Sequence, residues 1–522
     1  MDGMMQPVPL LVRDIAQRAE RVYGDRELVG RTAAGTERRT YAEVVERARR
    51  VASSLRELGV GPGDRVATFM WNSLAHLELY LAVPSLGAVL HTLNLRLFED
   101  DLRYIVGHAE DRVVVVDASL AELMPRFEGV EHEVLVRDGP GERAGAREYE
   151  ELVSGGDPGF AFPELPEDSA AAMCYTSGTT GRPKGVVYSH RSTVLHSMAV
   201  CTVDSMGLRE ADRVMPIVPM FHANAWGIPY GAAMTGSALV MPGADLSPAA
   251  LASLIESERV TYSAGVPTIW HGFLQLDPSP DLSSLREVLA GGSAVPESLM
   301  RAFDERFGVP IVQGWGMTET SPLASVARVP AALAADGDGR SDEAYRVRAL
   351  QGRLQPLVEG RIDDEAGGEL QVHGPWIAAG YYRSEEGADR FTEDGWLRTG
   401  DVAQLEPGGI VKLVDRTKDL VKSGGEWISS VELENAIMAH PDVLEAAVIA
   451  VPDERWSERP CACVVVREGA DVDADGLRGF LADRVAKWWL PERVEFIDEV
   501  PKTSVGKFDK KVLRARFAEV PA

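Results

Sequence analysis

The chain has 522 residues, 45% of them hydrophobic, so it is long enough for at least two packed domains and too apolar for wholesale disorder. Its 54 basic and 80 acidic side chains give a formal net charge of −26, which argues against a nucleic acid or an anionic membrane as a partner. The four cysteines are too few for a disulfide framework, and we expect all of them to be reduced.

Targeting and membrane signals are not evident in the sequence. The N-terminal residues lack the basic segment, apolar core and cleavage site of a secretion signal. No apolar run reaches the length of a membrane span. We therefore expect a cytoplasmic protein with no integral membrane segment. Because the chain is acidic, an anionic substrate would have to be met by local positive charge or by a metal ion.

The first part of the chain predicts alternating helices and strands. Residues 40–43 form a capping box that opens an amphipathic helix, and Gly59 follows the end of that helix. Residues 64–70 predict a strand, and a second helix is expected over residues 77–85. Residues 112–117 are a continuous apolar run, which is typical of a strand buried on both faces.

The alternation continues through the middle of the chain. Ser189 is expected to cap a helix that runs to about residue 203. Ser247 and Pro248 are a good N-cap and first-turn pair for a helix to about residue 258. Strands are expected at residues 214–219, 238–242, 260–264, 288–291 and 309–313. Strands that alternate with helices imply a mostly parallel sheet covered on both faces.

A change of composition near residues 334–368 predicts a boundary region. Short strands near residues 369–372 and 410–414 indicate a small β-rich subdomain. The charged residues 415–420 are the expected hinge or linker between an N-terminal domain (1–414) and a C-terminal domain (421–522). In the latter we expect helices near 430–439, 476–487 and 510–517, and strands near 445–451, 462–467 and 493–498.

These elements together predict an α/β fold. We expect a large N-terminal domain of parallel sheets sandwiched by helices, a small β-rich subdomain, and a small α+β C-terminal domain.

The most informative stretch is Ala-Met-Cys-Tyr-Thr-Ser-Gly-Thr-Thr-Gly-Arg-Pro-Lys-Gly-Val at residues 172–186. Its glycines allow backbone amides to approach an anion, its hydroxyls add donors, and Lys184 adds charge. The common phosphate loop requires Gly-Lys-Ser/Thr, which is not the register found here. We therefore predict a phosphate-binding loop of another kind, with an ordinary Gly/Thr-rich surface turn as the alternative.

Three further stretches carry candidate chemistry. Residues 314–321 place an aromatic side chain that could stack on a base beside Glu319, which could bind Mg²⁺. Asp401 is expected at a tight turn after a strand, where its carboxylate could accept both ribose hydroxyls. Residues 501–510 form a lysine-bearing loop. The alternatives are an ordinary strand-to-helix loop, a turn-forming aspartate and a solvated charged loop, respectively.

The motifs taken together resemble those of the acyl-CoA synthetase branch of the adenylate-forming superfamily. They are Tyr-Thr-Ser-Gly-Thr-Thr-Gly-Arg-Pro-Lys-Gly, Gly-Trp-Gly-Met-Thr-Glu-Thr, Thr-Gly-Asp, Asp-Arg-Thr-Lys-Asp and Ser-Val-Gly-Lys, in this order. The resemblance runs from about residue 30 to the end of the chain. Residues 218–227 and 422–430 look most like bacterial medium- and long-chain fatty acid–CoA ligases. This sequence has Trp315 where the family usually has tyrosine.

The resemblance implies a two-step reaction with ATP, Mg²⁺ and CoA. A carboxylic acid, expected to be a medium- to long-chain fatty acid, reacts with ATP to give acyl-AMP and pyrophosphate. CoA then displaces AMP to give the thioester. A carboxylate must approach a polyanion in the first step, so positive charge has to stabilise the crowded negative groups.

Roles for individual residues follow from the same resemblance. Thr176 and Glu319 are expected to hold Mg²⁺, and Lys507, preferred over Lys502, bridges the acid and the α-phosphate. His222 is expected near the acid carboxylate as a further catalytic residue. The remaining candidate nucleotide- or CoA-binding residues are Ser177, Gly178, Thr179, Thr180, Lys184, Ala223, Trp226, Gly292, Gln313, Gly314, Trp315, Gly316, Thr318, Asp401, Arg416, Lys418, Lys422, Gly424, Gly425 and Trp427.

Within this set the resemblance implies particular tasks. Residues 176–180 and Lys184 hold the β- and γ-phosphates, Gly292 and residues 313–316 line the adenine site, and Thr318 touches the α-phosphate. Asp401 and Arg416 hold the ribose. Trp226 resembles a residue at the mouth of the acyl tunnel, with an ordinary core tryptophan as the alternative. Tyr230, Val266 and Met317 are further candidates for the acid pocket.

The resemblance also implies movement. The C-terminal domain is expected to rotate at Asp415 between the two steps, which removes Lys507 and brings Gly424 and Gly425 to the CoA side.

Other functions stay open at this point. An aryl or short-chain acid–CoA ligase is the main alternative, because one sequence does not give the shape of the acid pocket. A ligase that loads a carrier protein is less favoured, since no carrier domain follows residue 522. A catalytically inactive nucleotide-binding protein is disfavoured because Lys507, Glu319 and Asp401 are all present. A homodimer is the oligomer that we consider.

Overall fold

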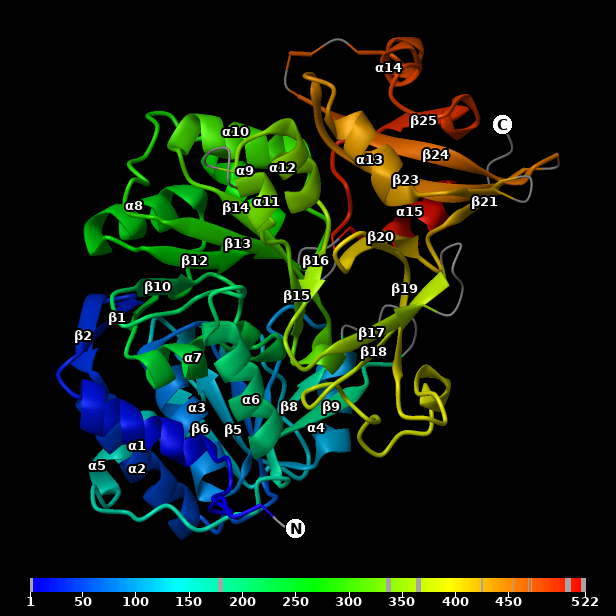
Figure 1. Ribbon diagram of the computed structural model, residues 1–522. Coiled ribbons are helices and arrows are strands. Elements are labelled where there is room, and N and C mark those ends of the chain that lie inside the picture. Colours follow the sequence, from blue (N-terminus) through cyan, green and yellow to red (C-terminus); the bar gives the residue numbers. More distant parts are fainter. Residues whose placement is uncertain are drawn as a thin grey trace.

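The protein is described here by a computed structural model (Figure 1). The structure describes residues 3–176, 182–334, 339–362, 368–423, 426–453, 455–467, 469–470, 472–502 and 508–517. The fold has the predicted parts: a large α/β unit formed by two sheets and their helices, followed by a small α+β unit at the C-terminus.

The first sheet has seven strands and is parallel apart from its last strand. In spatial order they are β7 (Arg147–Glu148), β6 (His132–Val136), β5 (Asp111–Asp117), β3 (Arg65–Phe69), β4 (Val89–Thr92), β8 (Ala170–Tyr175) and β9 (Gly185–Ser189). The run of four valines in β5 is fully buried because both faces of this sheet are covered, as the sequence predicts.

Helices cover the two faces of this sheet unequally. Side chains of α4 (Glu99–Ala109) share a core with one face, and those of α2 (Tyr41–Glu57) and α3 (Leu74–Leu86) share a core with the other. The predicted caps are confirmed: the Thr40 hydroxyl accepts a hydrogen bond from Glu43 N, and the Glu43 carboxylate accepts one from Thr40 N. The remaining helices of this region are α1 (Val12–Tyr23), η1 (Ala118–Leu120), α5 (Tyr149–Gly155), α6 (His190–Cys201), η2 (Ala223–Gly227) and α7 (Ile228–Thr235).

The second sheet has thirteen strands. In spatial order they are β17 (Glu359–Ile362), β18 (Gly368–His373), β19 (Leu397–Glu406), β20 (Ile410–Arg416), β16 (Gly352–Leu354), β15 (Leu323–Val326), β14 (Ile311–Gly316), β13 (Glu287–Gly291), β12 (Tyr262–Gly265), β10 (Arg213–Pro216), β11 (Ala238–Met241), β1 (Glu27–Thr32) and β2 (Gly35–Thr40). Strands from β14 to β1 pair in parallel, and those from β15 to β17 pair antiparallel. The expected β-rich subdomain is therefore continuous with the parallel sheet.

Helices cover this sheet as well. One face packs against α8 (Pro248–Glu258), α9 (Pro267–Phe273), α10 (Glu297–Phe307) and α12 (Asp342–Arg348), and the other shares a core with α1, α3 and α7. Both predicted N-caps are confirmed: Ser189 accepts a hydrogen bond from Ser192 N, and Ser247 accepts one from Ala250 N. Shorter elements are η3 (Thr318–Thr320), α11 (Ala331–Ala334) and η4 (Ala388–Arg390).

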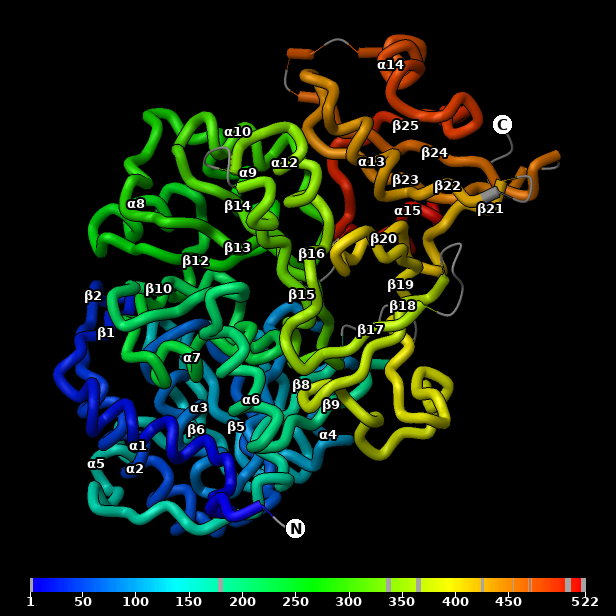
Figure 2. Tube along the Cα trace, viewed as in Figure 1, coloured from blue at the N-terminus to red at the C-terminus, as the bar shows by residue number. Residues whose placement is uncertain are grey.

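The C-terminal unit is a five-stranded sheet with helices on both faces. Its elements are β21 (Val421–Ser423), β22 (Glu426–Ile428), α13 (Ser430–Met438), β23 (Val443–Asp453), β24 (Ser457–Val466), α14 (Ala474–Leu481), η5 (Lys487–Trp489), β25 (Arg493–Phe496) and α15 (Lys510–Phe517). The tube in Figure 2 shows this unit, in orange and red, beside α10 and α12 of the large unit.

One predicted helix is shorter than expected. The helix predicted for residues 476–487 ends at Leu481 because Leu477 and Leu481 are its last buried positions, and residues 482–484 are exposed. The predicted cysteine state agrees with the structure, in which all four cysteines are free. Among the described residues, no helix is both long enough and apolar enough to cross a membrane.

Candidate functional site

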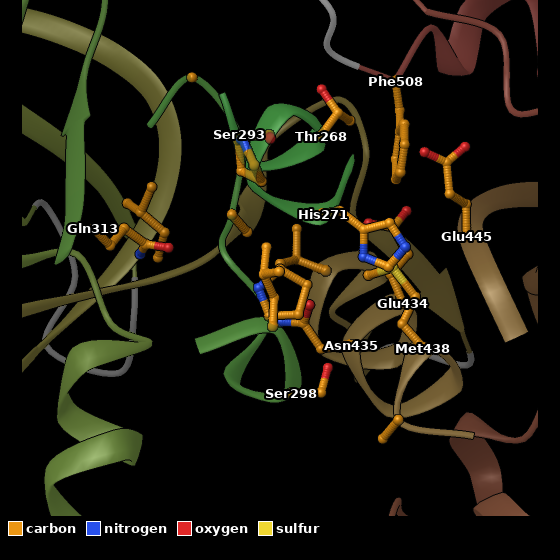
Figure 3. Close-up of a pocket in the computed structure, with 18 of the residues that line it drawn as sticks. Thr268, His271, Ser293, Ser298, Gln313, Glu434, Asn435, Met438, Glu445 and Phe508 are labelled. Carbon is orange, nitrogen blue, oxygen red and sulfur yellow. The ribbon is translucent and has the colours of Figure 1, made fainter. Parts of the chain in front are cut away.

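Two adjoining cavities lie at the ends of the second sheet. The larger, of about 510 Å³, opens between the large unit and the C-terminal unit, and the smaller is about 270 Å³. In Figure 3, Glu434, Asn435 and Met438 of the C-terminal unit lie beside His271 of the large unit. The two cavities share the lining residues Gly292, Gly314, Trp315, Gly316, Arg416 and Lys418. They therefore form one continuous candidate site.

The predicted phosphate loop connects two paired strands at the smaller cavity. β8 ends at Tyr175 and β9 begins at Gly185, and these two residues are partners in the antiparallel pair. Thr176 N donates to the Lys184 carbonyl (2.9 Å), and Lys184 N donates to Thr176 Oγ1 (3.0 Å). Thr176 and Lys184 both line the smaller cavity. The predicted residues Ser177, Gly178, Thr179 and Thr180 lie outside the described residues.

Aromatic residues brace the stem of this loop. The Tyr175 hydroxyl lies 2.7 Å from His108 Nδ1 on α4, and a Cβ on Gly185 would lie 3.1 Å from the Tyr175 ring. The His108 ring stacks on Tyr104, and the Arg182 guanidinium lies 5.0 Å from the Tyr104 ring centroid. Strand β8 of the stem is thus held against α4 through Tyr175, and Arg182, which precedes β9, packs against the same helix.

Glu319 is buried in η3 and lines the smaller cavity together with Thr176. Its Oε1 atom accepts a hydrogen bond of 2.6 Å from the Tyr381 hydroxyl. Burial raises the pKa of Tyr381 above its ordinary value, so the phenol keeps its proton and donates to the carboxylate. Thr318, the predicted neighbour of the α-phosphate, also lines this cavity, and its carbonyl accepts a bond from Tyr188.

Asp401 lies inside strand β19, so its predicted place at a tight turn is wrong. Gly400 does have a left-handed backbone (φ 76°), as a turn residue would. Strand β19 nevertheless continues through Gly400 and pairs with β20. Asp401 faces Arg416 across the two strands, with an ion pair of 3.1 Å from Arg416 Nε to Oδ1. Trp315 Nε1 donates to the other oxygen, Oδ2, at 3.0 Å. The indole therefore gives Asp401 a second fixed partner.

Two other predicted nucleotide-binding positions differ in how they contribute. Gln313 lines the larger cavity, but its amide is occupied by the backbone: Oε1 accepts from Val295 N, and Nε2 donates to the Leu350 carbonyl. Gln313 thus connects three segments of the cavity wall. Gly292 lines both cavities and has a left-handed backbone (φ 87°), which glycine adopts without strain.

His222 and Trp226 line the smaller cavity, as do the predicted acid-pocket residues Val266 and Met317. Residues 223–226 are four successive non-glycine residues with positive φ, between 42° and 57°. Such backbone is strained for L-residues, and it persists where surrounding packing holds it. The predicted residue Ala223 is buried within this turn. The Trp226 ring packs closely on Gly291, since a Cβ on that glycine would lie 3.0 Å from the ring.

Tyr230 does not line either of the two cavities. It is almost fully buried, and its hydroxyl donates to the Tyr80 carbonyl. It packs in the core cluster that also contains Tyr80 and Trp226.

Of the site residues predicted after Arg416, the structure brings only some to the two cavities. Lys418 lines both cavities, and burial lowers its pKa. Lys422 and Trp427 contact each other on the β21–β22 hairpin, with 5.0 Å from the Lys422 Nζ atom to the Trp427 ring centroid, but neither lines these two cavities. Lys507, Gly424 and Gly425 lie outside the described residues.

A buried ionic cluster lies where the two units join. Asp415 Oδ2 accepts a hydrogen bond from Ser430 N at the start of α13 (2.6 Å). Lys510 Nζ lies 2.7 Å from Glu434 Oε1 and donates to Ser430 Oγ (2.6 Å). Asp415, Glu434 and Lys510 all line the larger cavity. The sequence predicts Asp415 here but gives no sign of the other two partners.

Sequence reasoning missed some residues of the smaller cavity. They are Arg182, Val218, Pro219, Pro322, Leu323, Tyr381, Arg390, Thr399, Gly400 and Thr417. Tyr381 follows a glycine and precedes a second tyrosine, and this pattern has no spacing that would indicate a site. Within the described residues there is no group of three or more His, Cys, Asp or Glu side chains that could hold a metal ion.

Comparison with known proteins assigns the family. Residues 15–382 match the model of the AMP-binding enzyme family, and residues 432–507 match that of the AMP-binding enzyme C-terminal domain. The chain belongs to the AMP-binding enzyme family. The first of these matches contains Thr176, Lys184 and Glu319, and the second ends at Lys507.

Relatives of this AMP-binding enzyme extend over nearly the whole chain. A long-chain-fatty-acid–CoA ligase of Thermus thermophilus is 46% identical, covering 97% of this chain and 95% of its own. A 3-methylmercaptopropionyl-CoA ligase of Ruegeria lacuscaerulensis is 43% identical, with 99% of each chain covered. Among solved structures, the anthranilate CoA ligase AuaEII in complex with anthranoyl-AMP has a TM-score of 0.87 at 25% identity, with 99% of each chain covered.

Proposed function

We propose that this protein is an AMP-forming carboxylic acid–CoA ligase. The observation that carries the proposal is the convergence of three motifs on one pair of cavities. The stem of the phosphate loop with Lys184, the carboxylate of Glu319, and the pair Asp401–Arg416 come from distant parts of the chain. The family assignment and the names of the relatives support this function.

The described contacts suggest how ATP would bind. Asp401, held by Trp315 and Arg416, offers carboxylate oxygens to the two ribose hydroxyls. The phosphate loop and Lys184 would surround the β- and γ-phosphates. The adenine would lie against residues 313–316 and Gly292, where the two cavities meet.

The residues present also fit a magnesium ion. Thr176 and Glu319 both line the smaller cavity and supply a hydroxyl and a carboxylate oxygen, which are the hard donors that Mg²⁺ prefers. The Thr176 hydroxyl has two lone pairs, and only one of them accepts the bond from Lys184 N. Mg²⁺ is usually held by one or two protein oxygens together with substrate phosphates, and when bound it would neutralise phosphate charge.

The first half-reaction forms the acyl adenylate. An oxygen of the acid carboxylate attacks the α-phosphorus of ATP, and the bond to the bridging oxygen of pyrophosphate breaks. We assign Lys507 to bridge the carboxylate and the α-phosphate, Thr318 to contact that phosphate, and His222 to lie near the acid. Lys184 holds the leaving pyrophosphate by charge.

The second half-reaction forms the thioester. The CoA sulfur attacks the acyl carbon, AMP leaves with the bonding electron pair, and the thiol proton is lost. We propose that the C-terminal unit, beginning after residues 415–420, rotates at Asp415 and brings Gly424 and Gly425 to the CoA side, with Lys418, Lys422 and Trp427 nearby. The position of Lys422 and Trp427 outside both cavities is consistent with a role in a second orientation.

For the acid we propose an aliphatic substrate, a medium- to long-chain fatty acid. The pocket candidates Trp226, Val266 and Met317 are apolar, and one relative is named for long-chain fatty acids. A short-chain acid is the second candidate, because another relative at similar identity is named for 3-methylmercaptopropionate. We further propose that the protein acts in the cytoplasm, and the homodimer stays a prediction.

The direct test is acid-dependent AMP formation across a panel of acids, with and without CoA. We expect stoichiometric thioester and AMP in the presence of CoA, with the highest kcat/KM for aliphatic acids. Continued AMP release that never requires CoA would contradict the ligase assignment. Activity confined to benzoates or cinnamates would contradict the aliphatic substrate.

Half-reactions test the role of Lys507. We expect Lys507→Ala to lose acyl-AMP formation and to keep most thioester formation from supplied acyl-AMP. Lys502→Ala is the matched control, because Lys502 forms an ion pair with Glu445 (2.8 Å) and should leave both half-reactions close to wild type. Equal loss of both half-reactions in Lys507→Ala would argue against the proposed rotation.

A further inference from the structure

The segment of residues 378–382 connects the two motifs that we assign to metal and phosphate binding. At one end, Ala378 N donates to the Glu319 carbonyl (2.8 Å). At the other, Tyr382 N donates to the carbonyl of Gly185, the residue after Lys184 (2.8 Å). This segment, which we call the bridge, therefore fixes the distance between η3 and the phosphate-loop stem.

One side chain of the bridge touches both functional groups. The Tyr381 hydroxyl donates to Glu319 Oε1 at 2.6 Å, and Lys184 Nζ lies 5.4 Å from the Tyr381 ring centroid. A cation over an aromatic face within about 6 Å is attracted by the ring. Tyr381 lines the same cavity as Thr176, Lys184 and Glu319.

The surroundings leave this tyrosine little freedom. Phe391 packs edge-to-face on the ring, with 5.5 Å between centroids. Gly387 has a left-handed backbone (φ 84°), and a Cβ there would lie 2.8 Å from Lys184 Nζ and 3.1 Å from the Tyr381 ring. A side chain at residue 387 would therefore displace the Lys184 ammonium and press on the Tyr381 ring, and the left-handed backbone there also favours glycine.

We propose that Tyr381 is a positioning residue that holds the Glu319 carboxylate for Mg²⁺ and the Lys184 ammonium for the phosphates. The inference rests on the roles proposed above for Glu319 and Lys184. A metal-binding carboxylate with a free second oxygen can rotate, and a hydrogen bond to one oxygen fixes the direction of the other. Loss of such supporting partners typically weakens metal binding by about 10- to 100-fold.

The two contacts can be separated by substitution. Tyr381→Phe removes the hydroxyl and keeps the ring under Lys184, whereas Tyr381→Leu removes both contacts. The probes are the non-hydrolysable analogue α,β-methylene-ATP and Mn²⁺ as a spectroscopic substitute for Mg²⁺. Equilibrium binding of both is measured on the full chain without acid or CoA, using calorimetry for the nucleotide and electron paramagnetic resonance for free Mn²⁺.

For Tyr381→Phe we expect Mn²⁺ affinity in the nucleotide complex to fall about tenfold, while affinity for the metal-free analogue stays within about twofold. Tyr381→Leu should weaken both. In a Glu319→Gln background, Tyr381→Phe should cause no further loss of Mn²⁺ affinity, because the hydroxyl acts through the carboxylate. Additive losses in that double variant, or unchanged Mn²⁺ affinity in Tyr381→Phe, would overturn the proposal.

The matched control is Tyr345→Phe. The Tyr345 hydroxyl is buried and donates to the Asp304 carboxylate at 2.8 Å, so this variant loses the same kind of bond outside both cavities. We expect it to leave Mn²⁺ binding within about twofold of wild type. An equal loss in this control would assign the effect to general destabilisation and overturn the proposal. Failure of the ligase assignment would appear separately, as absent acid-dependent AMP formation, since this binding test uses no acid.

Discussion

The Trp315 indole donates to Asp401 Oδ2 at 3.0 Å, although the two residues are 86 positions apart in the sequence. The bond joins β14 of the parallel part of the second sheet to β19 of its antiparallel part. Arg416 holds the other carboxylate oxygen at 3.1 Å, so Asp401 is fixed in one orientation. An aromatic residue expected only to stack on the base thus also supports the group assigned to the ribose.

The first prediction tests this bond. Trp315→Phe keeps an aromatic ring but leaves Asp401 without its indole donor. A hydrogen bond to a charged group contributes roughly 1.5–3 kcal/mol, so we expect KM for ATP to rise about tenfold or more with little change in kcat. ATP-dependent pyrophosphate exchange at saturating acid measures both constants.

Trp396→Phe is the control for this substitution. Trp396 packs against His373 and Arg361 and does not line either cavity. It should keep the wild-type KM. An unchanged KM in Trp315→Phe would show that Asp401 does not need the indole.

A second prediction concerns the stem of the phosphate loop. Tyr175→Phe removes the contact of 2.7 Å with His108 Nδ1 but keeps the ring against Gly185. A neutral hydrogen bond contributes about 1 kcal/mol, so KM for ATP should rise about fivefold. His108→Ala should have the same effect, and His108→Gln, which can still bond to the phenol, should restore part of the affinity.

The control for the stem is Tyr262→Phe, because the buried Tyr262 hydroxyl has no hydrogen-bond partner in the described structure. Pyrophosphate exchange should be indistinguishable from wild type in this variant. Comparable losses in Tyr262→Phe and Tyr175→Phe would remove the case for the stem contact.

Local signals explain which parts of the fold could be predicted. The caps at Thr40, Ser189 and Ser247 involve residues only three positions apart, so the sequence contains both partners. Residues 112–117 indicate a buried strand because their apolar character does not alternate. The end of α14 was missed because it depends on where burial against the C-terminal sheet stops.

The site residues also divide into those with a local sequence signal and those that only the folded chain brings together. Lys184, Glu319 and Arg416 lie in motifs and do line the cavities. Tyr381 and Glu434 lie in none of the motifs recognised in the sequence. Their partners are 62 and 76 residues away, so only the folded chain brings each pair together. Gln313 lies in a predicted motif and lines the larger cavity, yet the bonds of its side chain to two other backbone segments, at Val295 and at residues 349–350, are visible only in three dimensions.

A third prediction concerns the buried pair Glu434–Lys510 near the proposed hinge. Glu434→Gln leaves the Lys510 ammonium buried without its main counter-charge, and breaking a buried pair typically costs about 3–5 kcal/mol. We expect a loss of that order in the unfolding free energy of the C-terminal unit, measured by urea denaturation.

The double variant Glu434→Leu with Lys510→Met separates charge from packing. It removes both charges and should recover most of the lost stability, since apolar replacements of a buried pair are often neutral. If the double variant were less stable than Glu434→Gln alone, the ion pair would contribute stability beyond cancelling the cost of burying its own two charges.

The last prediction is a pH dependence of stability that comes from Asp117. This side chain at the end of β5 is fully buried, and burial raises its pKa from the ordinary 3.8 to about 8. Trp71 N donates to Oδ2 at 2.7 Å, and Oδ1 has no partner in the described structure. Between the ordinary pKa and about 8, the folded protein therefore holds a proton that the unfolded chain has lost.

The sign follows from this proton balance. Where the folded state binds one proton more, the free energy of unfolding falls by about 1.4 kcal/mol for each unit of rising pH. Asp117→Asn is neutral at every pH and keeps an acceptor for Trp71 N. Its advantage over wild type should therefore grow by about 4 kcal/mol from about pH 5 to about pH 8 in urea unfolding. A constant difference between the two proteins over that range would mean that Asp117 is ionised in the folded state.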